Sequence, residues 1–184
     1  MILPVYIYGH PILRKVTRDI PADYPGLKEL LADMYETMEN AEGVGLAATQ
    51  IGREDRILVV DLNALNEPAL KGFRKTFINA HIVELDGEDE TMEEGCLSIP
   101  GVHEKVLRKN RLRLKYLDEN MQPHDEVFEG YKARVLQHEL DHLEGVMFTD
   151  HIQGIRKQMI RSKLNRLIEG RTNCKYKVKA APKR

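Results

Sequence analysis

The segment His138-Glu139-Leu140-Asp141-His142 limits the possible folds of this chain more than any other feature. Two imidazoles four residues apart can bind one ion only where the segment is helical, because residues i and i+4 lie on one face of an α-helix. Glu139, beside the first histidine, could take a proton from a water held by that ion. A surface helix with two unrelated histidines would share the pattern, so the motif alone makes a metal site a hypothesis.

A third ligand is needed, because a catalytic site of the zinc type has three protein ligands and one open position. Zincin proteases take this ligand from beyond the helix, but Glu144, Asp150 and His151 do not stand at the spacing of those families. Upstream, Cys96 lies in a turn that contains glycine, and a thiolate is a strong ligand for a borderline ion. A single cysteine is also commonly a small buried hydrophobic residue. Cys96 is therefore either the third metal ligand or a residue of the core.

A glycine-rich segment, Gly43–Gln50, is the third feature. Two glycines separated by one residue let the backbone approach a ligand closely, and Gln50 adds an amide with donors and an acceptor. The segment lacks the Lys-Ser/Thr ending of a phosphate loop and the third glycine of a dinucleotide fingerprint. A helix C-cap followed by a turn would use the same glycines.

The pattern of apolar residues predicts the fold class. Helical spacing is found over residues 26–41, 131–145 and 155–168, and strand-like segments over residues 57–60, 76–83 and 112–116. The acidic stretch 86–94 is predicted to be a solvated loop. Strands that follow one another with few helices between them favour an α+β fold with mostly antiparallel sheets over a doubly wound sheet.

Composition is that of one globular domain. The chain has 184 residues, 42% of them hydrophobic and 31% charged, which predicts a single packed core. The first residues have no positive region or long apolar run, and no segment approaches the roughly 20 apolar residues that span a bilayer. With only two cysteines, we expect a cytoplasmic protein without a membrane partner.

Charge is distributed unevenly. Residues 154–184 hold 11 of the 28 basic residues and one of the 29 acidic residues, so their net charge is +10 and that of the remainder is −11. A basic tail favours an anionic partner, although solvated charge gives the same imbalance. The expected helix over residues 155–168 has an apolar side formed by Ile155, Met159, Ile160, Leu164 and Leu167.

Three segments in order carry a family resemblance. Gly-x-Gly-Leu-Ala-Ala-x-Gln stands at 43–50, Glu-Gly-Cys-Leu-Ser at 94–98 and Gln-His-Glu-x-Asp-His at 137–142, and Gly9–Arg14 is similar to the same family's opening segment. Together they resemble the signature motifs of the peptide deformylases over about residues 2–153. The resemblance implies an α+β fold in which antiparallel sheets surround a central helix carrying the His-Glu-x-x-His motif, with a C-terminal helix.

The resemblance also implies the roles of individual residues. The metal ligands would be Cys96, His138 and His142, and Glu139 would be the general base and acid. Gln50 and the backbone N–H of Leu97 would face the formyl oxygen as an oxyanion hole. The ion implied is Fe(II), with Zn(II), Ni(II) or Co(II) as other possible occupants.

Further positions concern the substrate. By resemblance, the backbone around Val44, Gly45 and Gly95 would hold the peptide as an added strand. Arg134 lies one turn before the first ligand histidine, where many relatives carry an apolar residue of the methionine pocket. Its side chain either contacts substrate or packs its aliphatic part and extends its guanidinium group to solvent. His103 stands where several relatives have arginine.

The implied function is removal of the formyl group from the N-terminal formylmethionine of nascent polypeptides. Residues 1–153 would form the catalytic domain, and residues 154–184 a basic helix and tail of the same domain that could bind the ribosome through RNA phosphates. Two alternatives stay open. A zincin-like metallo-endopeptidase would share the helix motif without needing Cys96, and a ribosome-associated factor could keep the fold without activity.

Overall fold

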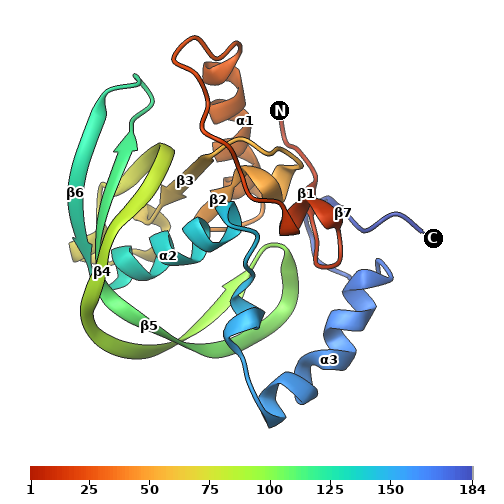
Figure 1. Cartoon of the computed structure of the whole chain (residues 1–184). Helices are drawn as coiled ribbons and strands as arrows, with labels where there is room; N and C mark the ends of the chain where they lie inside the picture. The colour runs from red at the N-terminus through yellow and green to blue at the C-terminus, as the bar shows by residue number, and fades with distance from the viewer. Residues whose placement is uncertain (184) are drawn as a thin grey trace.

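The computed structural model describes residues 1–183 (Figure 1). Its helices and strands follow this order along the chain: β1 Val5–Tyr6, α1 Leu27–Asn40, β2 Gly45–Ala47, β3 Ile57–Asp61, β4 Arg74–Cys96, β5 Ile99–Leu117, β6 Pro123–Glu129, α2 Tyr131–Leu143, α3 Ile155–Ile168 and β7 Val178–Lys179. Short 3₁₀ helices lie at Pro11–Arg14, Ala48–Ile51, Asn63–Leu65, Pro68–Leu70 and Phe148–His151.

The main sheet has the strand order β2-β3-β4-β5-β6, and every neighbouring pair is antiparallel. The predicted α+β class with antiparallel pairing is therefore confirmed. Figure 1 shows the long strands β4 and β5 curving around α2. Their register shifts at four places, and such irregularities let a strand bend and twist.

The acidic stretch 86–94 is not a loop, as its composition predicted, but the second half of β4. It pairs with the basic part of β5, with Asp86 opposite Arg111 and Asp89 opposite Lys109. The side chains of these two pairs form ion pairs at 2.8 and 3.0 Å. Opposite charges across a ladder stabilise a strand that has little apolar surface to bury.

Helix α2 is buried along most of its length, from Ala133 to His142 with one half-buried exception at Asp141. Its apolar residues, including Leu136 and Leu140, pack against the inner face of the sheet at Leu112. A helix enclosed in this way presents any polar side chain to the protein interior. The two histidines of the motif are therefore held in a protected environment, 8% and 1% exposed for His138 and His142.

Helix α3 has the predicted bounds but a different apolar side. Ile160, Leu164 and Leu167 are buried, whereas Ile155 and Met159 are each 72% exposed. The predicted apolar side is therefore only partly buried, because the i, i+4, i+7 stripe of Ile160, Leu164 and Leu167 is the part of the helix that faces the body. Figure 1 shows the chain after α3 returning to lie beside β1, where β7 pairs with it in parallel. Among residues 1–183, no helix combines the length and apolarity needed to cross a membrane.

Candidate metal centre

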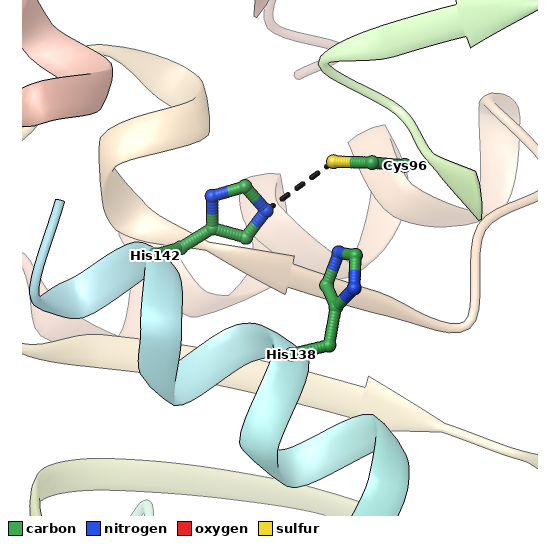
Figure 2. Close-up of side chains that lie close together, drawn as sticks. All are labelled: Cys96, His138 and His142. Atoms are coloured by element: carbon green, nitrogen blue, oxygen red, sulfur yellow. Dashed lines mark hydrogen bonds between the residues drawn. The ribbon is translucent and has the colours of Figure 1, made fainter. Parts of the chain in front are cut away.

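The side chains of Cys96, His138 and His142 converge at one point (Figure 2). One potential ligand atom from each residue lies within 4.8 Å of the others. Cys96 ends β4, and the two histidines lie one turn apart on α2. The Cys96 Sγ atom lies 3.3 Å from His142 Nε2. The structure thus brings together the three residues that the sequence resemblance named as ligands.

The end of β4 places Cys96 through a local irregularity. The register shifts between Glu94 and Cys96, so the strand kinks at Gly95. A Cβ added at Gly95 would lie 2.7 Å from the His103 ring, so a larger residue would displace that ring. Gly95 therefore permits the close approach of His103 to the strand that carries the thiol.

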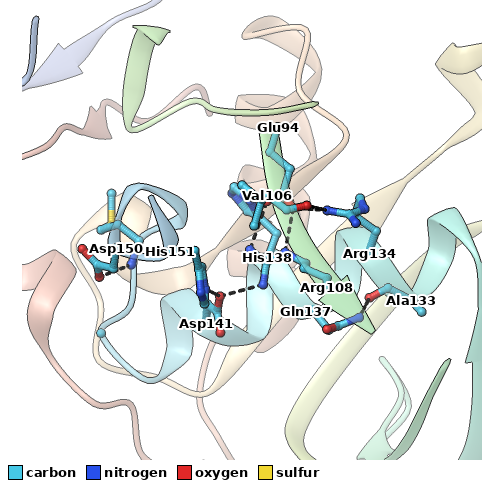
Figure 3. A network of polar contacts seen from close by, with 12 residues as sticks. Glu94, Val106, Arg108, Ala133, Arg134, Gln137, His138, Asp141, Asp150 and His151 are labelled. Carbon is cyan, nitrogen blue, oxygen red and sulfur yellow. Dashed lines mark hydrogen bonds and ion pairs between the residues drawn. The ribbon is translucent and has the colours of Figure 1, made fainter. Parts of the chain in front are cut away.

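Glu94 organises the surroundings of His138 (Figure 3). His138 Nδ1 lies 2.8 Å from Glu94 Oε1, and Arg108 donates two hydrogen bonds to the same carboxylate at 2.6 and 3.0 Å. Burial raises the pKa of Glu94, but the hydrogen bonds from His138 and Arg108 outweigh it and lower the pKa from 4.5 to about 2. The ionised carboxylate can only accept, so His138 donates from Nδ1 and leaves Nε2 for an ion.

Arg134 forms a second ion pair with Glu94. Its guanidinium donates to Glu94 Oε2 at 2.6 Å and to the backbone carbonyls of Glu90 at 2.6 Å and Val106 at 3.0 Å. The residue is 4% exposed, so the alternative in which its head extends to solvent is wrong. A buried carboxylate within reach holds the head inside, and the side chain connects α2 to both long strands.

Glu139 is a buried carboxylate that includes an oxygen without a hydrogen-bond partner in the described part of the chain. It is 4% exposed, and its Oε2 atom has no hydrogen-bond partner among the described residues. Burial raises the pKa of Glu139 to about 7, with the neighbouring Glu94 adding to the rise. A Cβ added at Gly45 would lie 2.6 Å from Glu139 Oε1, so the glycine of β2 makes room for this carboxylate. A group titrating near neutrality is suited to accept and return a proton.

Gln50 presents its amide nitrogen to the site. Its Oε1 atom accepts from the Ala47 backbone N–H at 2.9 Å, which fixes the orientation of the amide. Nε2 then points towards Ser98 Oγ at 3.1 Å and Cys96 Sγ at 3.6 Å. The amide donor of the glycine-rich segment therefore faces the residues of the cysteine turn.

A cavity of about 440 Å³ opens beside these groups. It is lined by residues of all three sequence motifs and of the C-terminal tail, namely Glu42, Gly43, Val44, Gly45, Gln50, Glu93, Glu94, Gly95, Cys96, Leu97, Ile99, Pro100, Gly101, His103, Tyr131, Arg134, Val135, His138, Glu139, Cys174 and Tyr176. A larger surface hollow of about 920 Å³ between β6 and the loop before β4 contains none of the three convergent residues, so we place the candidate site in the smaller one.

The donor set suits a borderline divalent ion, because it combines one thiol with two imidazoles. Burial lowers the pKa of His142 well below 6.5, which keeps the ring in the neutral form that binds metals. Burial also lowers the pKa of His138, but hydrogen bonds with Cys96 and Glu94 outweigh it and raise the pKa well above 6.5. The surroundings of His138 therefore favour positive charge, and the residues fit a metal ion.

Comparison with known proteins identifies the family. A sequence model described as polypeptide deformylase matches residues 2–158. The chain belongs to this family. It is 50% identical to a peptide deformylase of Flavobacterium johnsoniae over 98% of this chain and 97% of that protein. Solved deformylases of Legionella pneumophila (33% identity, TM-score 0.81, covering 94% and 100% of the two chains) and of Ehrlichia chaffeensis in complex with actinonin (32%, TM-score 0.83, 93% and 99%) share its fold.

The deformylase resemblance seen in the sequence is thus confirmed, and the zincin-like alternative is not favoured. The three downstream residues considered as zincin-type ligands are each paired elsewhere: Glu144 with Arg56, Asp150 with Arg14 and His151 with Asp141.

Two features of the deformylase site were not predicted from the sequence, namely Arg108 and the tail residues Cys174 and Tyr176. Arg108 lies within a basic strand and has no local feature that marks it, yet it is 6% exposed and contacts Glu94. Cys174 and Tyr176 reach the cavity only because the tail folds back along β1. Glu94 itself was part of a recognised motif, but its position beside His138 could be read only from the fold.

Proposed function

We propose that this chain is a metal-dependent hydrolase that removes the N-formyl group from the N-terminal formylmethionine of nascent polypeptides. The observation that carries the proposal is the convergence of Cys96, His138 and His142 beside the unpartnered Oε2 atom of Glu139. Proteins of the same family that match almost the whole chain are named peptide deformylases.

Cys96, His138 and His142 would hold the ion. A divalent ion bound there supplies positive charge to the formyl oxygen and lowers the pKa of water at the site. Glu139 takes a proton from the attacking water at Oε2 and returns it to the departing methionine nitrogen. A carboxyl whose pKa is about 7 can do both at neutral pH. Formate and the free amino terminus are the products.

Gln50 and Leu97 are proposed to stabilise the transition state. The Nε2 atom of Gln50 and the backbone N–H of Leu97 would donate to the formyl oxygen as it gains charge. The orientation of the Gln50 amide, fixed by the Ala47 N–H, supports this role because preorganised donors need no rearrangement during the reaction.

The substrate peptide is proposed to bind along β2. This strand is at the edge of the sheet and, within residues 1–183, pairs with β3 alone, so its other side can accept an added strand at Val44 and Gly45, opposite Gly95. The aliphatic stem of Arg134 is proposed to form one wall of the methionine pocket, since the residue lines the cavity while its head is engaged by Glu94. His103 lines the same cavity.

Two substitutions test the roles together. Cys96→Ser should weaken metal retention, whereas Glu139→Ala should keep the metal and lose nearly all turnover, because one residue coordinates and the other transfers protons. Formate release from formyl-Met-Ala-Ser, measured beside cleavage of an internal peptide bond, separates this function from an endopeptidase. Full activity in Glu139→Ala would refute the mechanism.

Fe(II) is the ion that we propose in the native enzyme, with Zn(II), Ni(II) or Co(II) as alternatives. The mixed thiolate and imidazole donor set supports a borderline ion, and availability in the cell then decides among them. Metal analysis of anaerobically purified protein, together with the formyl-peptide assay, tests the assignment. Zinc as the only metal in fully active protein would overturn it.

We propose that residues 154–184 extend the domain formed by residues 1–153 and that the protein works in the cytoplasm, where nascent chains are made. The pairing of β7 with β1 and the burial of Ile160, Leu164 and Leu167 support a single unit. Both cysteines are free, in keeping with a reducing compartment.

We also propose that α3 binds ribosomal RNA. Its basic residues Lys157, Arg161 and Lys163 are exposed, so they can contact phosphates.

Deleting the tail would be an unsuitable test because α3 also packs against the body and the segment after it reaches the cavity. Changing these three residues to Glu should abolish salt-sensitive co-sedimentation with ribosomes while short-peptide activity is kept. The matched control changes Lys15, Lys28 and Lys71, three exposed lysines outside α3, to Glu. Equal ribosome binding by both triple variants would contradict the proposal that α3 binds ribosomal RNA.

A further inference from the structure

The turn after Cys96 does not belong to the usual hairpin types. Leu97 and Ser98 join β4 to β5, because Cys96 pairs with Ile99. Two-residue hairpin loops are mostly type I′ or II′ turns, which need a positive φ at a central position. Neither Leu97 nor Ser98 has a positive φ. We expect contacts from outside the hairpin to hold their conformation.

Three groups from distant segments donate hydrogen bonds to this turn. The Tyr8 backbone N–H donates to the Ser98 carbonyl at 2.8 Å, and Gln50 Nε2 donates to Ser98 Oγ at 3.1 Å. The Tyr176 hydroxyl donates to the Leu97 carbonyl at 2.6 Å. Burial raises the pKa of Tyr176, so its phenol stays protonated and able to donate.

The C-terminal tail is anchored around Tyr176. The Val5 N–H donates to the Lys177 carbonyl at 2.9 Å, and β7 continues the pairing with β1. Val178 and Ala180 pack against the cluster that includes Ile160 and Leu164. The residues that directly follow Tyr176 are therefore fixed against β1 and the core, although Tyr176 lies outside residues 2–158, the part matched by the family's sequence model.

We propose that Tyr176 is a positioning residue that acts through Leu97, an inference that rests on the proposed function. The Leu97 N–H is proposed above as an oxyanion donor, and such donors are effective because their direction is fixed before the reaction. Only the φ and ψ torsions of Leu97 separate its N–H from its carbonyl. Fixing the carbonyl therefore restricts the direction of the N–H.

The test compares Tyr176→Phe, which removes only a hydroxyl, with Tyr24→Phe. The Tyr24 hydroxyl donates to Asp55 at 2.7 Å, and neither residue lines the cavity. For proteins with equal metal content acting on formyl-Met-Ala-Ser, kcat of Tyr176→Phe should fall about tenfold, less than the roughly 10²–10³ lost with a direct oxyanion donor. KM should stay within about twofold, because the contact acts on the transition state.

Hydrogen exchange gives a second readout that does not depend on turnover. Backbone amides of residues 96–99 should exchange faster in Tyr176→Phe than in the wild type, with and without metal, because the turn has lost one of these three hydrogen bonds. Tyr24→Phe should exchange like the wild type over the same residues.

The outcomes distinguish this inference from the proposed function. Wild-type protein that releases no formate would overturn the function and the inference with it. An active wild type whose Tyr176→Phe variant has the kcat of Tyr24→Phe, or unchanged exchange at residues 96–99, would overturn the inference alone. A raised KM with unchanged kcat would also overturn it, because Tyr176 would then bind substrate directly.

Discussion

Glu94→Gln should destabilise the protein strongly, because this one carboxylate compensates two buried guanidinium groups. Glu94, Arg108 and Arg134 are 7%, 6% and 4% exposed. Arg108 would keep a second carboxylate, Asp141 at 2.9 Å, but Glu94 is the only carboxylate paired with Arg134 within the described chain. The neutral amide keeps the shape of the side chain, leaves Arg134 without a counter-ion and leaves Arg108 with Asp141 alone.

Two estimates of the free energy of unfolding lost in Glu94→Gln agree. The pKa of Glu94, lowered from 4.5 to about 2, corresponds to about 3 kcal/mol at roughly 1.4 kcal/mol for each tenfold change in proton affinity. Removing one partner of a buried ion pair generally costs about 3–5 kcal/mol. We therefore expect the free energy of unfolding to fall by about 3 kcal/mol and Tm by about 10 °C for a chain of this size.

Denaturant unfolding of the metal-free protein measures this loss without the added stability that a bound ion would give. The matched control is Asp125→Asn, because Asp125 also accepts two hydrogen bonds from one arginine, Arg113, at 2.9 and 2.8 Å. That pair is on the surface, so Asp125→Asn should lower the free energy of unfolding much less than Glu94→Gln.

The pH dependence has a definite sign. The folded pKa of Glu94 is below its ordinary value, so its contribution is complete above about pH 4.5 and is lost as the pH falls towards 2. The stability difference between wild type and Glu94→Gln should therefore be constant near neutral pH and shrink in acid. A Glu94→Gln variant that loses no more stability than Asp125→Asn would refute this explanation of the network.

Three further predictions concern the candidate site, the core and the metal ion. Gly45→Ala should reduce kcat by more than about tenfold at unchanged metal content, because its Cβ would displace Glu139; steady-state kinetics with metal analysis check this. Leu114→Ala should cost about 2–5 kcal/mol in denaturant unfolding, since Leu114 is fully buried in the core against α2. If the ion is Fe(II), peroxide should inactivate the enzyme, because the metal and the Cys96 thiolate are both oxidisable; iron-loaded protein that keeps its activity after peroxide would contradict this.

The sequence by itself determined the local elements and named the three residues that converge at the candidate metal centre. The apolar periodicity predicted α1, α2 and α3 to within about two residues, because helical spacing is a property of neighbouring positions. The spacing of His138 and His142 required a helix for the same reason. Cys96 could be added only through the family resemblance, since no local rule connects it to residues more than forty positions away.

Only the tertiary structure decided the features that depend on contacts between distant segments. The stretch 86–94 has the composition of a loop, and its strand exists because a basic partner strand lies opposite. Arg134 is exposed or buried according to whether Glu94 is within reach, and Tyr176 joins the site because β7 pairs with β1. Cross-strand pairing and burial are set by the whole chain, so the residues themselves do not carry a local signal for them.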